Sequence, residues 1–380
     1  MKFKIKQTEL IKIVKFCNKV IESKNESINP NTKFIKISLS KNGNFVYCTN
    51  NVVSGVYKID DEKIEIENYG NTLIKNDLLN DIISRLNEND EIKITKLENS
   101  VLSIKSNKIS SEINVLDFPF PKIEINENDL LKINLTLNSL NEIYRKNGTC
   151  ALNDQRQTKP ISGIYFTNEL ESNKLTTMST DTYKLSLLEN KINTNEKFNF
   201  IIPSSTINTI VSIFKDEKNI DIFVNANEKK LIVKNNNLTI IDRTINGEYP
   251  KDIFLNAFKV NTQTKVIIDR QEIYNSLEMI KSVVKNEVNP VVEFDFQKNS
   301  ILLSASSFNT GNIDINIENN NFEGNEIKIR FNVNFLLTLI KNIDSKKIIF
   351  EIEDNAKPML IYGENDKDFK ELILPIKINN

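Results

Sequence analysis

The stretch NDLLNDIISRLN, residues 76–87, has a spacing of apolar residues that recurs in residues 204–215 (SSTINTIVSIFK) and 333–344 (VNFLLTLIKNID). In each stretch four apolar side chains follow the spacing i, i+3, i+4, i+7, which places them on one face of an α-helix. The pattern therefore predicts the same amphipathic helix three times. The residues that carry it are Leu79, Ile82, Ile83 and Leu86; Ile207, Ile210, Val211 and Phe214; and Leu336, Leu339, Ile340 and Ile343.

A second marker repeats in step with the first. Two apolar residues separated by one position are followed by a third five positions later, and this arrangement occurs three times. Two independent markers with a period of roughly 130 residues indicate one domain copied three times. The sets are Phe3, Ile5 and Leu10; Ile133, Leu135 and Leu140; and Val266, Ile268 and Ile273.

Length and composition agree with this organisation. The 380 residues have room for about three domains of ordinary size. The chain is 39% hydrophobic and 27% charged, so it can bury cores. It has no apolar run of about 18 residues, and its start (MKFKIKQTEL) lacks the apolar segment of a signal peptide. We expect a cytoplasmic protein without a membrane span, and the abundance of Asn, Lys and Ile suggests an AT-rich genome.

The reactive residue types argue against catalysis. Histidine is absent, which removes the commonest general base and metal ligand. The nine glycines form no phosphate-binding loop motif, and Cys17, Cys48 and Cys150 are too few and scattered for a disulfide framework or metal site. We therefore expect buried thiols, no cofactor, no metal and no enzyme. An active site built from Asp, Lys, Tyr or Ser in an interdomain cleft is the enzymatic alternative.

Each repeat has the pattern of an α+β module. An alternating strand at Lys2–Lys6 precedes a helix to about Ser23, another strand covers residues 34–39, and the second helix covers residues 76–87. Two helices packed on antiparallel strands form an α+β module, here in three tandem copies. Side chains suited to N-capping stand at the expected helix starts, and they are Asn76, Ser204, Asn332, Thr136 and Asp269.

Proline-containing joints divide the repeats. Residues 120–122 (FPK) and 249–251 (YPK) each lie just before a new opening strand. Proline lacks an N–H group, so it ends a strand at a boundary. We predict domains at residues 1–125, 126–257 and 258–380, docked closely because no Gly/Ser/Pro-rich linker separates them.

Positive charge recurs on the polar faces of the predicted helices. Lysines on a single helix usually serve solubility, but basic residues on equivalent helices favour one shared surface facing phosphate. The net charge of −1 and pI of about 6.0 imply that this surface touches DNA without gripping it. The predicted DNA-facing residues are Lys12, Lys15, Lys19, Arg85, Arg145, Lys146, Lys215, Lys281, Lys285 and Lys341.

Local motifs on this triplicated chain resemble one family, the bacterial DNA polymerase III β subunit, or sliding clamp. Residues 179–185 (STDTYKL) are similar to the family's T-D-G-H-R-L, and 246–250 (NGEYP) to its G-x-[FY]-P. Residues 372–378 (LILPIKI) resemble its C-terminal apolar-apolar-P-[MV]-R-L. Residues 161–163 (ISG) resemble its L-[TN]-G, and 331–333 (FNV) its F-N-[VP]. The resemblance spans the whole chain.

The resemblance implies a head-to-tail homodimer of six domains, whose twelve helices line a hole around double-stranded DNA. It implies a processivity factor that tethers the replicative polymerase, the clamp loader and repair factors by encirclement, which raises their effective concentration. Two alternatives stay open: a non-catalytic repeat scaffold outside the family, whose lysines serve only solubility, and a secondary, antibiotic-tolerant clamp copy within it.

The resemblance also implies a pocket between the second and third domains for short peptides, typically a glutamine followed by apolar residues. The chain departs from the family at Thr182, Tyr183 and Lys184, which replace Gly, His and Arg, and Phe254 stands where an arginine is usual. Without the resemblance, Pro375 and its neighbours would read as a last edge strand. The implied pocket residues are Ile161, Thr180, Thr182, Tyr183, Lys184, Leu185, Pro250, Asn332, Phe335, Ile373, Leu374, Pro375, Ile376 and Lys377.

Overall fold

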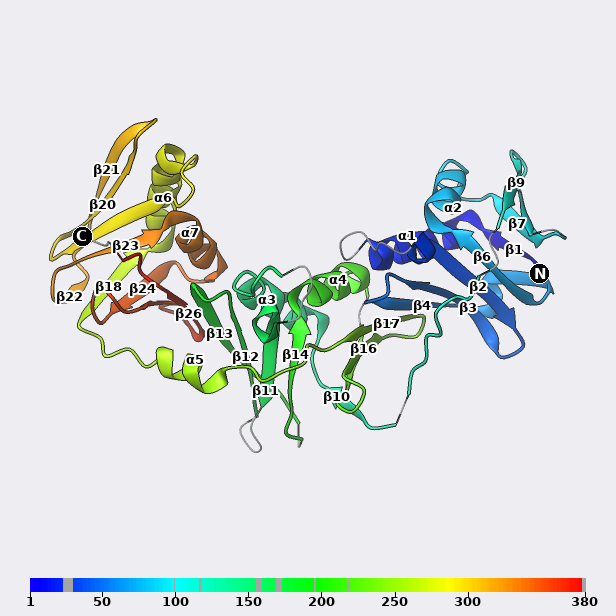
Figure 1. The fold of residues 1–380 in the computed structure, drawn as a ribbon, viewed down its shortest axis with the longest axis horizontal. Coiled ribbons are helices and arrows are strands. Elements are labelled where there is room, and N and C mark those ends of the chain that lie inside the picture. Colours follow the sequence, from blue (N-terminus) through cyan, green and yellow to red (C-terminus); the bar gives the residue numbers. More distant parts are fainter. Residues whose placement is uncertain are drawn as a thin grey trace. The chain divides into compact units, whose positions relative to one another are not determined.

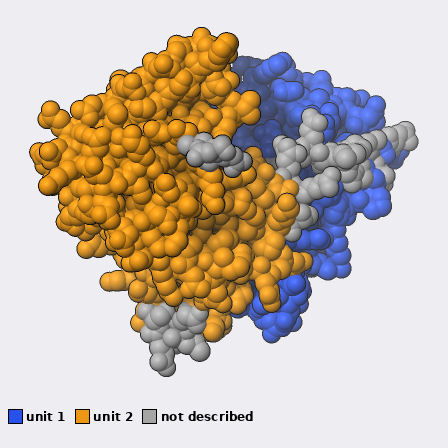
Figure 2. Space-filling view, turned by 60° about the vertical axis from the view of Figure 1, so that its left-hand side comes forward, with its two compact units in different colours: residues 1–141, 205–244 blue, residues 142–204, 245–380 orange. Residues whose placement is uncertain are grey.

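The chain forms two compact units in the computed structural model. Unit 1 comprises residues 1–141 and 205–244, and unit 2 comprises residues 142–204 and 245–380 (Figure 2). The division therefore runs through the second predicted repeat, and the three-domain boundaries stay a prediction. The structure describes residues 1–22, 30–98, 100–115, 118–126, 128–154, 159–168, 173–194, 196–217 and 219–377.

The predicted helix pairs are present in every repeat, in an α+β fold (Figure 1). A short helix at the second joint, α5, was not predicted, since residues 249–251 read as a boundary turn. Among the described residues, no helix is long and apolar enough to cross a membrane. The helices are α1 (Gln7–Ile21), α2 (Asn76–Ile83), α3 (Leu137–Asn147), α4 (Ser204–Phe214), α5 (Lys251–Ala257), α6 (Arg270–Val284) and α7 (Val333–Asn342).

Unit 1 contains two antiparallel sheets. One has the strand order β5-β1-β7-β8-β9, and the other has the order β10-β15-β16-β17-β4-β3-β2-β6. Helix α1 packs on α2 and on β3 and β4. The strands of the first repeat are β1 (Lys2–Lys6), β2 (Phe34–Ser40), β3 (Gly43–Thr49), β4 (Ser54–Ile59), β5 (Ile64–Asn68), β6 (Gly70–Lys75), β7 (Glu91–Lys96), β8 (Val101–Lys105) and β9 (Ser110–Asn114). Those of the second repeat in this unit are β10 (Leu130–Ile133), β15 (Asp221–Asn225), β16 (Lys230–Lys234) and β17 (Leu238–Arg243).

Unit 2 has the same kind of construction. Its sheets have the orders β14-β11-β12-β13-β26-β25-β24-β18-β22 and β21-β20-β19-β23, and α6 packs on α7 and β20. The strands of the second repeat here are β11 (Gly163–Asn168), β12 (Lys174–Thr180), β13 (Lys184–Lys191) and β14 (Asn199–Pro203). Those of the third repeat are β18 (Thr264–Asp269), β19 (Val291–Gln297), β20 (Ser300–Ser307), β21 (Gly311–Glu318), β22 (Phe322–Gly324), β23 (Ile327–Asn332), β24 (Lys347–Ile352), β25 (Met359–Gly363) and β26 (Asp366–Ile373).

Two sheets continue from one repeat into the next, each time by pairing of equivalent strands. In unit 1, β4 of the first repeat pairs with β17 of the second; we call this the first interface. In unit 2, β13 of the second repeat pairs with β26 of the third; this is the second interface. In both cases the third strand after a repeat's first helix joins the last strand of the following repeat. The units are compact because each contains one complete interface.

The helix stripes form the cores, as predicted. Leu79, Ile207 and Leu336 at equivalent positions of α2, α4 and α7 are fully buried. Helix α2 ends at Ile83, earlier than predicted, where the Gln7 side-chain amide donates a hydrogen bond to the Ile83 carbonyl. Leu86 lies beyond the helix and is nevertheless buried.

Three of the five predicted N-caps are confirmed. The carboxylate of Asp269 accepts from two N–H groups of α6, Asn332 does the same for α7, and the Thr136 hydroxyl accepts from the Ser139 N–H. Two were wrong. The Asn76 amide donates instead to the Val14 carbonyl and to Asn18, and the Ser204 hydroxyl donates to the Gly148 carbonyl. Strand β6 runs directly into α2, so Asn76 is the first helical residue rather than the residue before it.

The three cysteines are free and buried, as predicted. Cys17 on α1 lies beside Cys48 on β3, and burial raises the pKa of the Cys17 thiol well above its usual value. Burial likewise raises the pKa of Cys150, with nearby Glu371 adding to the effect. Thiols held protonated are poor nucleophiles, so these residues act as core side chains.

Candidate functional site

The turn between β12 and β13 in unit 2 carries the residues by which the chain departs from the family motif. The Asp181 carboxylate accepts from the backbone N–H groups of Tyr183 and Lys184, at 2.9 and 2.8 Å. The Thr180 hydroxyl donates to the Lys184 carbonyl at 2.7 Å and accepts from the Thr182 N–H at 3.0 Å. These bonds hold the turn in one conformation.

Thr182 occupies a backbone conformation that favours glycine. Its φ is +79°, in the left-handed region where a β-branched residue is strained by about 1–3 kcal/mol. The family's glycine would relieve this strain, and here the hydrogen bonds of Asp181 and Thr180 compensate for it. The turn therefore places a threonine in a conformation that suits glycine.

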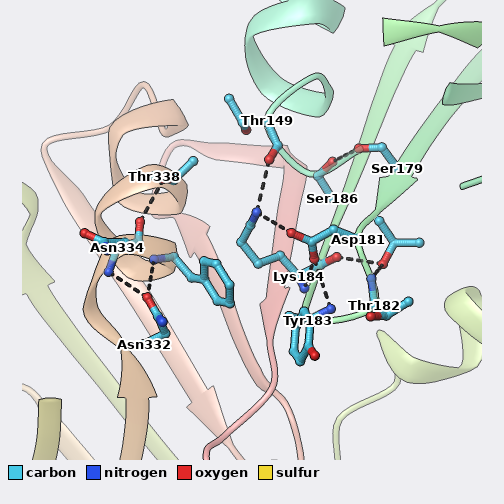
Figure 3. Close-up of polar contacts among 12 residues, drawn as sticks. Thr149, Ser179, Asp181, Thr182, Tyr183, Lys184, Ser186, Asn332, Asn334 and Thr338 are labelled. Carbon is cyan, nitrogen blue, oxygen red and sulfur yellow. Dashed lines mark hydrogen bonds and ion pairs between the residues drawn. The ribbon is translucent and has the colours of Figure 1, made fainter. Parts of the chain in front are cut away.

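Lys184 points inward rather than toward solvent (Figure 3). Its Nζ lies 2.7 Å from Asp181 Oδ2, donates to the Thr149 carbonyl at 3.1 Å, and lies 4.8 Å from the centre of the Phe335 ring. Its side chain is only 7% exposed. The Lys184 ammonium thus joins the turn to α7.

Tyr183 is the exposed member of the turn. Its side chain is 59% exposed and its ring lies 5.9 Å from that of Phe335. The Leu374 N–H donates to the Tyr183 carbonyl at 3.0 Å, and the Ile376 N–H donates to the Arg330 carbonyl at 2.8 Å. The C-terminal segment is thereby tied to the turn on one side and to β23 on the other. Tyr183, Phe335 and Leu374 form one partly exposed apolar surface.

The remaining predicted pocket residues fall into two apolar clusters and the helix cap. Leu185 packs with Leu360 and Leu372, and Ile161 packs on the cluster that contains Tyr249. Phe254 borders both clusters, so an aromatic ring fills the place where the family has an arginine. Thr180 and Ile373 are buried, Asn332 caps α7, and Pro250 precedes α5. Pro375 and Lys377 lie on the tied C-terminal segment, and Ile378 lies outside the described residues.

A buried polar cluster that sequence reasoning missed lies under this surface. Glu371 on β26 is fully buried; its Oε1 accepts from the Asn342 amide at 3.3 Å, which also donates to the Thr149 hydroxyl at 2.8 Å. Glu371 Oε2 has no hydrogen-bond partner among the described residues. Burial raises the pKa of Glu371 well above its usual value, against the lowering effects of the Asn342 hydrogen bond and of Lys184 and Lys146. No local signal marks Glu371 in the sequence, because β26 (DKDFKELI) carries three carboxylates and two lysines.

The predicted basic surface is present only in part. Lys12 and Lys15 are exposed on α1, as are Lys285 at the end of α6, Lys341 on α7 and Arg85 just beyond α2. Lys215 is exposed and Lys281 is partly exposed, and each has a carboxylate 4.0 Å away.

Three basic residues of the first helices are engaged within the units instead. The prediction that Lys146 faces DNA is wrong, because it is 3% exposed and its Nζ lies 2.9 Å from Asp366 and 4.8 Å from the Phe369 ring. Arg145 donates to the Asn342 carbonyl at 2.8 Å and pairs with Asp344. Lys19 donates to the Ser212 carbonyl at 2.6 Å, and both burial and nearby Lys215 lower its pKa.

The fold defines a class of protein in which repeats of two helices and antiparallel sheets follow one another along the chain. Its C-terminal segment lies beside a partly exposed apolar surface. Residues 135–251 match the model of the DNA polymerase III beta subunit central domain, and residues 256–377 that of its C-terminal domain. The chain belongs to the family of bacterial DNA polymerase III β subunits, the β sliding clamps. Members of this family are non-catalytic accessory proteins, in agreement with the expectation of no enzyme.

Individual relatives support the same conclusion over the whole chain. The "Beta sliding clamp" of Mycoplasma genitalium is 26% identical over 390 residues, which cover 99% of this chain and 100% of the relative. That of Lactococcus lactis is 24% identical and covers 100% of both. The crystal structure of the Bacillus subtilis DNA polymerase sliding clamp superposes with a TM-score of 0.90 at 22% identity, covering 100% of this chain and 99% of the other.

The buried Glu371 carboxyl makes the stability of unit 2 depend on pH. Its raised pKa means that the folded state favours the protonated acid, so stability is full below the unfolded pKa and falls as pH rises through the folded pKa. We expect Glu371→Gln to remove this loss, so that the variant gains stability relative to the parent as pH rises. Thermal unfolding of both proteins from about pH 5 to about pH 9 measures the difference.

Glu323→Gln, which changes an exposed carboxyl on β22, is the matched control and should track the parent at every pH. A constant difference between parent and Glu371→Gln across the range would show that Glu371 is not protonated on folding.

Proposed function

We propose that the chain assembles as a head-to-tail homodimer that encircles double-stranded DNA and tethers the polymerase, the clamp loader and repair factors through the Tyr183–Phe335–Leu374 surface. The pattern of strand pairing carries this proposal. At both interfaces the third strand after a repeat's first helix pairs with the last strand of the following repeat. The equivalent strands still free are β21 of the third repeat and β9 of the first, and each is the edge of its sheet.

A second copy supplies the missing pairing. If β21 of one copy pairs with β9 of the other, the four-stranded and five-stranded sheets join into a single sheet. That sheet has the same number of strands as the nine-stranded sheet of unit 2. A head-to-tail contact must close on itself or form a filament. Two copies of a three-repeat chain close with six equivalent interfaces and leave no free edge of this kind.

Apolar residues near these edges fit the same arrangement. Ile82 on α2 is half-buried, whereas its equivalents Ile210 and Leu339 are 1% and 0% exposed. Met279 on α6 is 50% exposed, whereas Phe16 at the equivalent position of α1 is 6% exposed. A second copy would cover both residues.

The homodimer is tested by mass and by charge at the apolar contact. The chain mass is 43.8 kDa, so light scattering at micromolar concentration should give roughly twice that value. Met279→Asp should shift the protein toward monomer, because a charge would be buried without a partner. Ile253→Asp, at an exposed apolar residue of α5 away from these edges, controls for added charge. Monomer alone across the concentration range would contradict the ring.

The exposed basic residues suit sequence-independent contact with phosphate. Lys12 and Lys15 are exposed on the same helix, and Lys215 lies close enough to Lys19 to lower its pKa. Weak positive charge within a ring of net charge near zero allows the protein to slide, since encirclement rather than affinity retains the DNA. Lys19, Arg145 and Lys146 contribute less, because they bind carbonyl and carboxylate groups of their own unit.

Reversing the charge of Lys12 and Lys15 tests the DNA-facing surface. Lys12→Glu/Lys15→Glu should weaken retention on circular duplex DNA without loss of folding, since both side chains are exposed. Each lost phosphate contact should flatten the logarithmic salt dependence of binding by about 0.9. Lys298→Glu/Lys367→Glu changes two exposed strand-end lysines by the same charge and should leave the slope unchanged. Equal effects of the two double variants would rule out a specific surface on α1.

The exposed apolar surface at the β12–β13 turn suits peptide anchors. Tyr183 and Leu374 present apolar area, and the tied C-terminal segment offers a rigid wall. Because Lys184 is turned inward, peptide selection rests on the aromatic pair of Tyr183 and Phe335 rather than on a cation. Aromatic side chains are common anchors of such sites.

Truncating Tyr183 tests the peptide surface. Tyr183→Ala should weaken binding of a peptide with a glutamine followed by apolar residues by about tenfold or more, as measured by calorimetry. Tyr69→Ala removes a tyrosine of similar exposure, 52%, in unit 1 and should have no effect. Unchanged affinity of Tyr183→Ala, or no binding by the parent protein, would reject the assignment of the pocket.

A further inference from the structure

The two interfaces share a contact that is separate from their strand pairing. At the first, the Lys19 ammonium on α1 donates to the Ser212 carbonyl in the last turn of α4, at 2.6 Å. Burial and nearby Lys215 lower the pKa of Lys19, and the Asp216 carboxylate, just beyond that helix, acts in the opposite direction. The carbonyl end of a helix carries partial negative charge, so a cation there is favourable.

At the second interface a different residue makes the equivalent contact. The Arg145 guanidinium on α3 donates to the Asn342 carbonyl, the last residue of α7, at 2.8 Å. It also pairs with Asp344, just beyond that helix. A cation from one repeat's first helix therefore meets the carbonyl end of the next repeat's second helix, together with the acid that follows it, at both interfaces.

Among the described residues of one chain, the third set of these groups is not brought together in this way. Lys281 on α6 follows Ile273 by eight residues, whereas Lys19 follows Leu10 by nine and Arg145 follows Leu140 by five. Lys281 lies three residues beyond the position equivalent to Arg145, one turn along the same helix face, and next to the position equivalent to Lys19. The Lys281 side chain is 41% exposed, and its Nζ lies 4.0 Å from Glu278 Oε1 on the same helix.

The acceptor end of the third set is on α2. Ser84 lies two residues before Leu86, as Ser212 lies two residues before Phe214. Arg85 lies one residue before Leu86, as Asn342 lies one residue before Ile343. Glu88 follows Leu86 as Asp216 follows Phe214. Ser84, Arg85 and Glu88 are all exposed. Both halves of the contact are thus present in the chain and accessible.

We propose that Lys281 of one copy binds the carbonyl end of α2 and Glu88 of a second copy, completing at the interface between copies the contact that Lys19 and Arg145 make within the chain. This inference rests on the proposed homodimer. It assigns Lys281 to assembly rather than to DNA, and the same contact accounts for why Lys19 and Arg145 are not free basic residues. One cation per interface fixes the helices of adjacent repeats to each other.

A charge-reversal cycle on the full-length protein tests the proposal. Lys281→Glu and Glu88→Lys should each raise the dimer dissociation constant about tenfold or more, measured by analytical ultracentrifugation, because each places like charges together. The double variant Lys281→Glu/Glu88→Lys should restore the constant to within about threefold of the parent, since opposite charges again face each other. Lys281→Arg should retain the parent value, as Arg145 serves in the second interface.

Lys285→Glu is the matched control, with the same charge change on α6 one turn further along, and it should leave the dimer constant unchanged. A dimeric parent whose constant is insensitive to Lys281→Glu, a double variant no better than the weaker single variant, or equal effects of Lys285→Glu and Lys281→Glu would overturn the Lys281 contact and leave the homodimer standing. A monomeric parent would overturn the homodimer and this inference together.

Discussion

Pairing of strands between successive repeats is the constraint on which the rest of the structure depends. Joining β4 to β17 and β13 to β26 makes continuous antiparallel sheets out of repeats that would otherwise expose strand edges. Because the pairing uses equivalent strands, each repeat presents one joining strand to its predecessor and another to its successor. A chain of three such repeats necessarily keeps one strand of each kind unpaired, which is why its architecture calls for a second copy.

The buried charges of unit 2 add specificity to that pairing. Lys146 reaches Asp366, Lys184 reaches Asp181, and Glu371 on β26 has one oxygen without a hydrogen-bond partner among the described residues. Replacing such groups by apolar residues is often neutral or stabilising, so their contribution to stability alone is weak. We interpret them as fixing the register of β13 on β26, because a one-residue slip would carry Glu371 to the other face of the sheet.

The sequence predicted the elements whose signal is local. The three helix stripes, the opening strand Lys2–Lys6 and the caps at Asp269 and Asn332 all depend on residues a few positions apart, and they are confirmed. The failures depend on distant partners. Nothing near Lys146 in the sequence indicates that Asp366 lies against it, 220 residues away. Asn76 was misassigned because the amide partners that turn it inward are on α1. The candidate pocket was predicted only from the family motifs. Tyr183 and Leu374 are far apart in the sequence, and only the folded chain brings them together.

The fate of the basic residues follows from the same constraint. A lysine on a first helix faces either solvent or the carbonyl end of the neighbouring repeat's helix, according to its position along the helix. Lys12 and Lys15 lie early on α1 and stay exposed, whereas Lys19 lies one turn later and is bound to α4. The basic residues predicted from the sequence therefore have two different roles. Some are exposed to solvent, and others bind the carbonyl end of a neighbouring helix at an interface. The positive surface that we propose to face DNA is therefore smaller than the predicted basic stripe, which suits a ring that holds its duplex by topology and needs only weak contact with it.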